Sequence, residues 1–279
     1  MFRQQRQQFL AKFNNVCQRL ILLRQRYGYP LLALVRRDFT IHYAPTVLGL
    51  GWTVLQPLLQ LSLYTVVFSV ILQVKFRPHD GAGGSILYDL CGFLPYMALN
   101  EGIQRACHSL VENRNILRKT IFPAEVLPAM AVVSAAVKEG IGLVLLIGMA
   151  FGFGVRPSAW IAFLPLLMLL RLTITLGLAW LVSVLKVFIS DMSQVLELIL
   201  MAWMFLTPIF YPVDKVPEGL QWLLQINPLF HLAAAYRAVV LEGRSPLPML
   251  PVLIVWAIII PSLGQWFFRK AIERAKDFL

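Results

Sequence analysis

Long apolar blocks are the feature that most constrains what this chain can fold into. A helix needs about 20 mainly apolar residues to cross the hydrocarbon core of a bilayer. Hydrophobic residues make up 58% of the 279-residue chain and charged residues 14%, whereas about 25% of an average soluble domain is charged. The apolar blocks are residues 47–74, 86–110, 126–153, 160–187, 195–210 and 247–268. The sequence therefore predicts an all-α polytopic membrane protein with six transmembrane helices.

Several charged residues lie inside these blocks. Glu101 and Arg105 stand four residues apart in the weakly apolar second block, so they share a helix face. Lys138, Glu139 and Arg171 interrupt the third and fourth blocks. Charges at such depth usually face a cavity or a partner. Two interpretations stay open: a polar path for a hydrophilic substrate or a proton, and ion pairs within the chain.

The first 43 residues are polar and basic. Between residues 13 and 39 apolar residues recur at helical spacing, and arginines, among them Arg36 and Arg37, fill the other faces. A basic amphipathic helix of this kind lies in the membrane interface. We therefore expect an N-terminal amphipathic interface helix within residues 1–43. The alternative is a soluble helix packed on a partner protein.

The stretch from residue 211 to residue 245 is half apolar but is interrupted by proline, glycine and charged residues. It is too broken for one spanning helix. Proline stops a preceding helix and is tolerated in the first turn of the next one. We therefore predict two short helices on either side of Asn227 and Pro228.

Positive charge is placed unevenly along the chain. With the N-terminus inside, the cytoplasmic segments (residues 1–43, 112–123, 186–191 and 269–279) carry 16 Lys and Arg, and the outer segments carry 6. Loops rich in Lys and Arg stay in the cytoplasm. This bias predicts two cytoplasmic termini, a transmembrane domain at residues 44–268 and a cytoplasmic tail after it. It also accounts for the net charge of +11 without nucleic-acid binding.

Motifs for catalysis are missing from the sequence. There is no G-x-x-x-x-G-K-[ST] phosphate loop, no HExxH and no GxSxG motif. The three cysteines and four histidines show no spacing typical of a zinc site. We therefore expect no catalytic residue, no bound cofactor and no metal site in this chain.

Aromatic residues gather in and near the blocks. Trp and Tyr at span ends often form an interfacial belt, and the same rings could instead form a stacking surface for sugars. Both interpretations stay open. The candidates for a channel surface, by stacking or by polarity, are Trp52, Tyr64, Glu101, Arg105, Trp203, Phe205 and Tyr211.

Four groups of residues occur together in a fixed order. The first is Arg37-Asp38-Phe39-Thr40-Ile41-His42-Tyr43 followed by Thr46-Val47-Leu48-Gly49, Trp52 and Gln56-Pro57. The second is Asn113-Arg114-Asn115-Ile116-Leu117-Arg118-Lys119 with Phe122-Pro123-Ala124-Glu125 and Pro128. The third is Asp191-Met192 with Thr207-Pro208-Ile209-Phe210-Tyr211-Pro212 and Val216-Pro217, and the fourth is Asn227-Pro228-Leu229, Tyr236-Arg237 and Gly243. Together these groups resemble the permease subunits of type-2 ABC polysaccharide exporters, which serve O-antigen, teichoic-acid and group-2 capsule export.

The resemblance implies a permease of the bacterial inner membrane. It implies a homodimer, two copies of a separate ABC ATPase that uses ATP and Mg²⁺, and a lipid-linked polysaccharide as substrate. It also implies a cytoplasmic coupling helix within residues 112–123 and two re-entrant periplasmic helices within residues 212–245. The residues expected to contact the ATPase are Arg114, Asn115, Leu117, Arg118 and Lys119.

We predict a channel between two copies of the chain. The lipid diphosphate would meet Arg36 or Arg37 at the headgroups. A periplasmic gate would comprise Trp222, Asn227, Pro228, Tyr236 and Arg237. Two alternatives stay open: an ATP-independent secondary transporter or lipid-linked sugar flippase, and a membrane transferase acting on lipid-linked sugars.

Overall fold

A computed structural model describes residues 28–43, 48–71, 82–119, 122–155 and 158–278. Every regular element in these ranges is a helix. The greater part of the predicted interface helix, and both ends of the predicted first span, lie outside the described residues.

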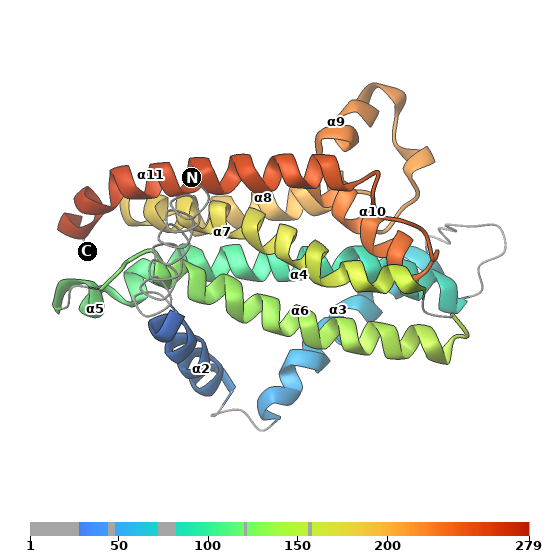
Figure 1. The fold of residues 1–279 in the computed structure, drawn as a ribbon, viewed down its shortest axis with the longest axis horizontal. Coiled ribbons are helices and arrows are strands. Elements are labelled where there is room, and N and C mark those ends of the chain that lie inside the picture. The colour runs from blue at the N-terminus through green and yellow to red at the C-terminus, as the bar shows by residue number, and fades with distance from the viewer. Residues whose placement is uncertain (1–27, 44–47, 72–81, 120–121, 156–157, 279) are drawn as a thin grey trace, which may run out of the picture.

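Five helices form a bundle that positions all the other elements (Figure 1). They are α4 (Ala82–Glu112), α6 (Val126–Gly152), α7 (Leu164–Phe188), α8 (Met192–Leu206) and α11 (Leu250–Phe278). Helix α4 packs against α6, α7 and α8, and α11 packs along α7. The most central element is therefore α4, although its sequence is only weakly apolar.

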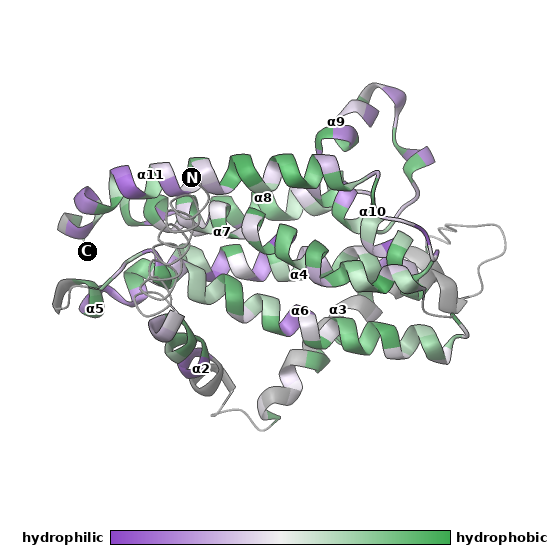
Figure 2. Cartoon of the chain, viewed as in Figure 1, coloured by the Kyte–Doolittle hydropathy of each residue, from purple (hydrophilic) through white to green (hydrophobic). Residues whose placement is uncertain are grey.

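Three helical stretches of the described residues are long and apolar enough to cross a membrane. They are Val126–Gly152, Ala159–Phe188 and Leu250–Lys276; the second joins a short 3-10 helix, η4 (Ala159–Phe163), to α7. Apolar residues run along much of these helices, and hydrophilic residues gather at the C-terminal end of α11 (Figure 2). The chain is thus an all-helical, polytopic membrane protein, as the sequence predicts. The count of six spans stays a prediction.

The predicted first span is not one regular helix. A 3-10 turn, η2 (Gly49–Gly51), leads into α3 (Trp52–Thr65), which continues as a π-helical stretch, η3 (Val66–Ile71). Gly49 has a φ of 51°, in the left-handed region that favours glycine. The regular α-helix therefore begins at Trp52, after this turn, rather than at residue 47.

Helix α8 ends earlier than the sequence pattern predicts. We expected the apolar helix to continue to Phe210, but it ends at Leu206, and Thr207 is extended with φ −99° and ψ 127°. Pro208 explains the difference, because a proline disfavours the helical conformation of the residue before it. At 15 residues, α8 is a short apolar helix.

The bundle has two distinct ends (Figure 1). At one end, here called the α5 end, lie α5 (Arg114–Lys119) and the C-terminus of α11. At the other, the α10 end, α9 (Gln221–Ile226) and α10 (Pro228–Val240) meet at Asn227. Helix α11 continues through Phe278, so no break separates the last apolar block from the expected tail.

Helices α7 and α11 approach each other closely at glycine. A Cβ placed on Gly177 would stand 2.5 Å from the Cα of Pro261, and one on Gly264 would collide with the carbonyl group of Gly177. Glycine therefore sets the separation of these two helices.

Candidate functional site

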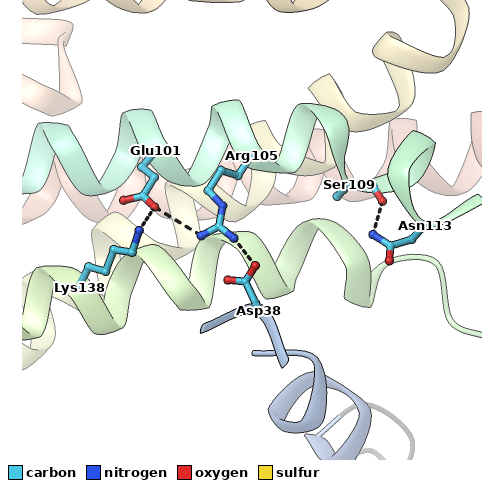
Figure 3. A network of polar contacts seen from close by, with 6 residues as sticks. All are labelled: Asp38, Glu101, Arg105, Ser109, Asn113 and Lys138. Atoms are coloured by element: carbon cyan, nitrogen blue, oxygen red, sulfur yellow. Dashed lines mark hydrogen bonds and ion pairs between the residues drawn. The ribbon is translucent and has the colours of Figure 1, made fainter. Parts of the chain in front are cut away.

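Four alternating charges connect three helices near the middle of the bundle (Figure 3). We call Asp38, Arg105, Glu101 and Lys138 the charge chain. Arg105 donates to Asp38 of α2 (Tyr29–Tyr43), and its Nη1 lies 3.4 Å from Oε1 of Glu101 on its own helix, α4. Lys138 of α6 donates to the same Glu101 oxygen. Arg105 is therefore shared by two carboxylates, and the four charges sum to zero.

A cavity of about 430 Å³ opens beside the charge chain, toward the α5 end. Residues of α2, α4, α6 and α8 line this polar cleft. The spacing of its polar residues follows from helix geometry, because residues four apart lie on one face. Its polar lining includes Gln104, His108 and Glu112 on α4, and Ser193, Gln194 and Glu197 on α8.

The cleft has the size and chemistry of a binding site. Small-molecule sites commonly have volumes of about 300–1,000 Å³. Amide, hydroxyl, imidazole and carboxylate groups face one another across the cavity, which gives both donors and acceptors. Such a surface can hold a hydroxyl-rich ligand by hydrogen bonds.

A second polar group lies in the buried core, between α6, α7 and α10. Nη2 of Arg171 lies 2.7 Å from Oε2 of Glu139, and both side chains are fully buried. Tyr236 donates to the other Glu139 oxygen at 2.7 Å. The Arg171–Glu139 contact is held by charge rather than by a well-directed hydrogen bond. This geometry fits the interpretation of an ion pair within the chain, and Tyr236 is part of it.

Arg237 ties α10 to the rest of the α10 end. Its guanidinium donates to the carbonyl oxygens of Tyr88, Pro208 and Ile209 at 3.2, 3.1 and 2.8 Å. It also lies over the Tyr88 ring, 3.7 Å from the centroid. Asp89, the next residue on α4, is buried, and neither of its oxygens has a hydrogen-bond partner among the described residues. The predicted gate residue Arg237 therefore binds backbone carbonyl groups of α4 and of the segment that follows α8.

Asn227 joins α8 to α10. Its Oδ1 accepts from Nε1 of Trp203 at 2.9 Å and from the backbone N–H of Leu229 at 3.0 Å. Its Nδ2 donates to Oγ1 of Thr207 at 2.9 Å. The side chain thus caps α10, which begins at Pro228, while it holds the C-terminal end of α8.

Comparison with known proteins agrees with this arrangement. The model of the family described as ABC-2 type transporter matches residues 29–241. The chain belongs to the ABC-2 type transporter family. Family membership implies in general that an ABC ATPase is the partner of the permease.

Relatives of this ABC-2 permease carry a more specific name. It is 27% identical over 247 residues to a Myxococcus xanthus protein named O-antigen export system permease protein RfbA, covering 85% of this chain and 93% of the relative. It is 24% identical over 250 residues to a Klebsiella pneumoniae protein of the same name, covering 89% and 94%. The predicted resemblance to polysaccharide export permeases is confirmed, and the relatives' names agree with a transport subunit rather than an enzyme.

The residues expected to contact the ATPase lie at the α5 end of the permease. Arg114 and Asn115 are exposed on α5, whereas Leu117 is buried against the core. The side chains of Arg118 and Lys119 lie outside the described part. The contact itself stays a prediction.

The basic and acidic side chains of helix α2 face different surroundings. Arg36 and Arg37 are exposed, whereas the side chain of Asp38 is only 9% exposed and contacts Arg105. The headgroup role of the two arginines stays a prediction. Both arginines face the outside of the bundle.

The aromatic candidates are not gathered on one surface. Trp52, Phe205 and Trp222 are exposed on α3, α8 and α9 respectively. Tyr211 donates to the Phe205 carbonyl oxygen at 2.6 Å, and partial burial raises the pKa of this phenol above its usual range. The side chain of Tyr64 lies outside the described part. Stacking and membrane anchoring therefore both stay open for Trp52, Phe205 and Tyr211, while the Trp203 indole N–H is held by Asn227.

Sequence reasoning missed much of the polar cleft. The sequence motif that contains Asp38 indicates no role for this residue, and no motif marks Gln104, Gln194 or Glu197. One signal was available: in α8, which is otherwise apolar, Ser193, Gln194 and Glu197 all fall within its first two turns. Polar residues confined to one end of an apolar helix indicate a local polar surface.

Proposed function

We propose that this ABC-2 permease is the membrane-spanning subunit of an ATP-driven exporter. It moves lipid-linked polysaccharide from the cytoplasm to the periplasm through a channel between two copies of the chain. The observation that carries the proposal is a polar cleft with an adjoining charge chain inside a helical membrane bundle, in a chain whose relatives are named O-antigen export permeases.

The polarity of the substrate explains the need for sheltered polar groups. A polysaccharide cannot cross hydrocarbon unaided, because each unpaired polar group there costs several kcal/mol. The charge chain and the cleft would offer such sheltered polar groups to the substrate at its entry from the α5 end. We place this end in the cytoplasm of a bacterium, with both termini, because the basic helix α5 and the basic C-terminal end of α11 lie there and the N-terminal segment is also rich in Arg.

Energy would come from the partner. The sequence contains no phosphate loop, so ATP and Mg²⁺ would bind to two copies of a separate ABC ATPase. Closure of the ATPase dimer would displace α5, and with it the helices that flank the channel. A ligand shifts such an equilibrium only through its different affinities for the two states. The contact at α5 must therefore differ between them.

The other parts of the chain fit this cycle. Arg36 and Arg37 would meet the lipid diphosphate at the cytoplasmic headgroups. Helices α9 and α10, as re-entrant elements at the periplasmic face, would gate the exit.

The test uses a cell that lacks this permease and its ATPase and makes the polymer. Polymer on the surface should return when both proteins are restored. It should fail to return when the ATPase carries an alanine in place of its phosphate-loop lysine. Export that persists with the inactive ATPase would overturn the proposal in favour of a secondary transporter. Polymer chemistry by the purified chain alone would favour a transferase.

A further inference from the structure

We propose that the polar cleft binds the neutral sugar portion of the substrate and excludes its diphosphate, which stays outside at Arg36 and Arg37. This inference rests on the proposed function. In this arrangement the sugar and the diphosphate of one substrate are recognised on different faces of helix α2.

The charge of the cleft carries the first step. Asp38, Glu112 and Glu197 line it, and Arg105 is its one arginine or lysine among the described residues. Arg105 already contacts both Asp38 and Glu101. An entering diphosphate would therefore meet a cation whose charge is already balanced and two further carboxylates. Like charges at close range repel strongly where water is scarce.

The hydrogen-bonding groups carry the second step. Nε2 of Gln104 donates to Oδ1 of Asn100 at 3.0 Å, and no described residue donates to Oε1 of Gln104. The side chains of His108, Gln194 and Glu197 make no hydrogen bond to another described residue. Amides, imidazole and carboxylate together offer donors and acceptors to sugar hydroxyls. A neutral, hydroxyl-rich chain matches this surface better than an anion does.

Helix α2 carries the third step. Asp38 points into the bundle, whereas its neighbours Arg36 and Arg37 are exposed. An exposed cationic surface and an acidic cleft thus lie on different faces of one helix. Lipid headgroup and sugar can occupy them at the same time, with the helix between them.

The first experiment is photo-crosslinking in cells that export the polymer. A benzophenone amino acid replaces Gln194 in the cleft, or Val195 as the matched control. Val195 is the next residue on α8, is 48% exposed and does not line the cleft. We expect polymer to be captured from position 194 and not from position 195. Capture at position 194 of a second copy of the chain, of phospholipid alone, or of nothing would overturn the inference.

The second experiment separates sugar from phosphate. Gln194→Leu removes a hydrogen-bonding group, and we expect a fall in export of about 2- to 10-fold at limiting substrate. Glu197→Lys adds a cation, and we expect export to fall as well. A rise in export with Glu197→Lys would mean that the cleft holds the diphosphate. Val195→Leu is the control, and membrane levels and gel-filtration profiles of all variants show whether they fold.

Failure of this inference differs from failure of the proposed function. If the function is wrong, surface polymer does not depend on the wild-type chain or on its ATPase. If only the cleft assignment is wrong, export depends on both proteins, but position 194 captures no polymer and Gln194→Leu exports normally.

Discussion

At the scale of single residues, the Arg171–Glu139 ion pair is a site where a substitution should change stability strongly. Both side chains are fully buried, and Tyr236 supplies one further hydrogen bond to the carboxylate. A buried ion pair is a weak net stabiliser, because both charges lose their hydration. Removal of one partner is much more harmful, because it leaves the other charge uncompensated.

We expect Arg171→Met to lower the free energy of unfolding by about 3–5 kcal/mol. The double variant Arg171→Met with Glu139→Gln should recover most of that loss, because no buried charge remains. Unfolding of the purified permease in mixed micelles of increasing SDS content measures both. The Glu139→Gln single variant completes the cycle, and a loss in the double variant equal to the sum of the two single losses would show that the side chains are not coupled.

The Asp38–Arg105 contact has a different role, because it connects elements rather than filling the core. Asp38→Asn should leave the stability of the bundle nearly unchanged but loosen α2. Hydrogen exchange of the Tyr29–Tyr43 amides should become faster, since local opening follows from the loss of local contacts. Glu101→Gln is the matched control, because α4 and α6 remain packed along their length. Unchanged exchange in Asp38→Asn would contradict this role.

Among the charged residues, sequence spacing predicts some contacts and misses others. Glu101 and Arg105 are four residues apart, and helix geometry alone places them together. Asp38 lies 67 residues before Arg105, and no local pattern connects them. The same holds for Tyr236 and Glu139, which are 97 residues apart. Local periodicity therefore predicts half of the charge chain, and packing of the helices decides the rest.

At the scale of elements, the close packing of α7 and α11 at glycine predicts that two glycine-to-alanine substitutions will change stability in opposite directions. Gly264→Ala should destabilise the permease by about 1–3 kcal/mol, because its new Cβ collides with the backbone of α7. Gly148→Ala should be neutral or stabilising by about 0.5–1 kcal/mol, because that position in α6 faces open space and alanine favours helix. The same SDS titration compares them. Equal effects would mean that α7 and α11 do not approach as described.

A charge change in α5 tests the link to the ATPase. Arg118→Glu with Lys119→Glu should leave membrane insertion intact but lower export about tenfold or more, since reversed charges at an interface repel the partner. Arg274→Glu is the control, because this exposed arginine lies near the C-terminus of α11. Export and co-purification of the ATPase are measured together. Normal values of both in the double variant would contradict the coupling role of α5.

Elements with a strong apolar pattern are the ones that the sequence predicts best. Val126–Gly152 and Leu250–Lys276 contain long apolar windows and appear as single helices. The boundaries of the others depend on local chemistry: Pro208 ends α8 early, and Gly49 delays α3. Helix α4 has mixed polarity because it lies at the centre of the bundle, where neighbouring helices cover it.

At the scale of the whole molecule, we predict that the α10 end of the bundle faces the outside of the cell and the α5 end faces the cytoplasm. In a chain whose own cysteines are replaced, a cysteine at Glu218 should react with an impermeant reagent from outside. Cysteines at Arg114 and Arg274 should react only after the cell is opened, because the basic segments remain inside. Whole-cell labelling with a maleimide, compared with lysed cells, gives the result. Reaction of position 114 in intact cells would reverse the proposed direction of transport.

Helix α8 connects the polar cleft to the α10 end of the bundle. Its first turns contribute Ser193, Gln194 and Glu197 to the cleft, and its 15 residues span about 22 Å. At its far end Asn227 binds Trp203 and Thr207 and caps α10. A short regular helix moves as a rigid body, so a displacement of one end along the helix axis also displaces the other end. If the cleft binds a sugar as we propose, a displacement of α8 by the cargo would reach α10 through these contacts, and the two sites would then respond together.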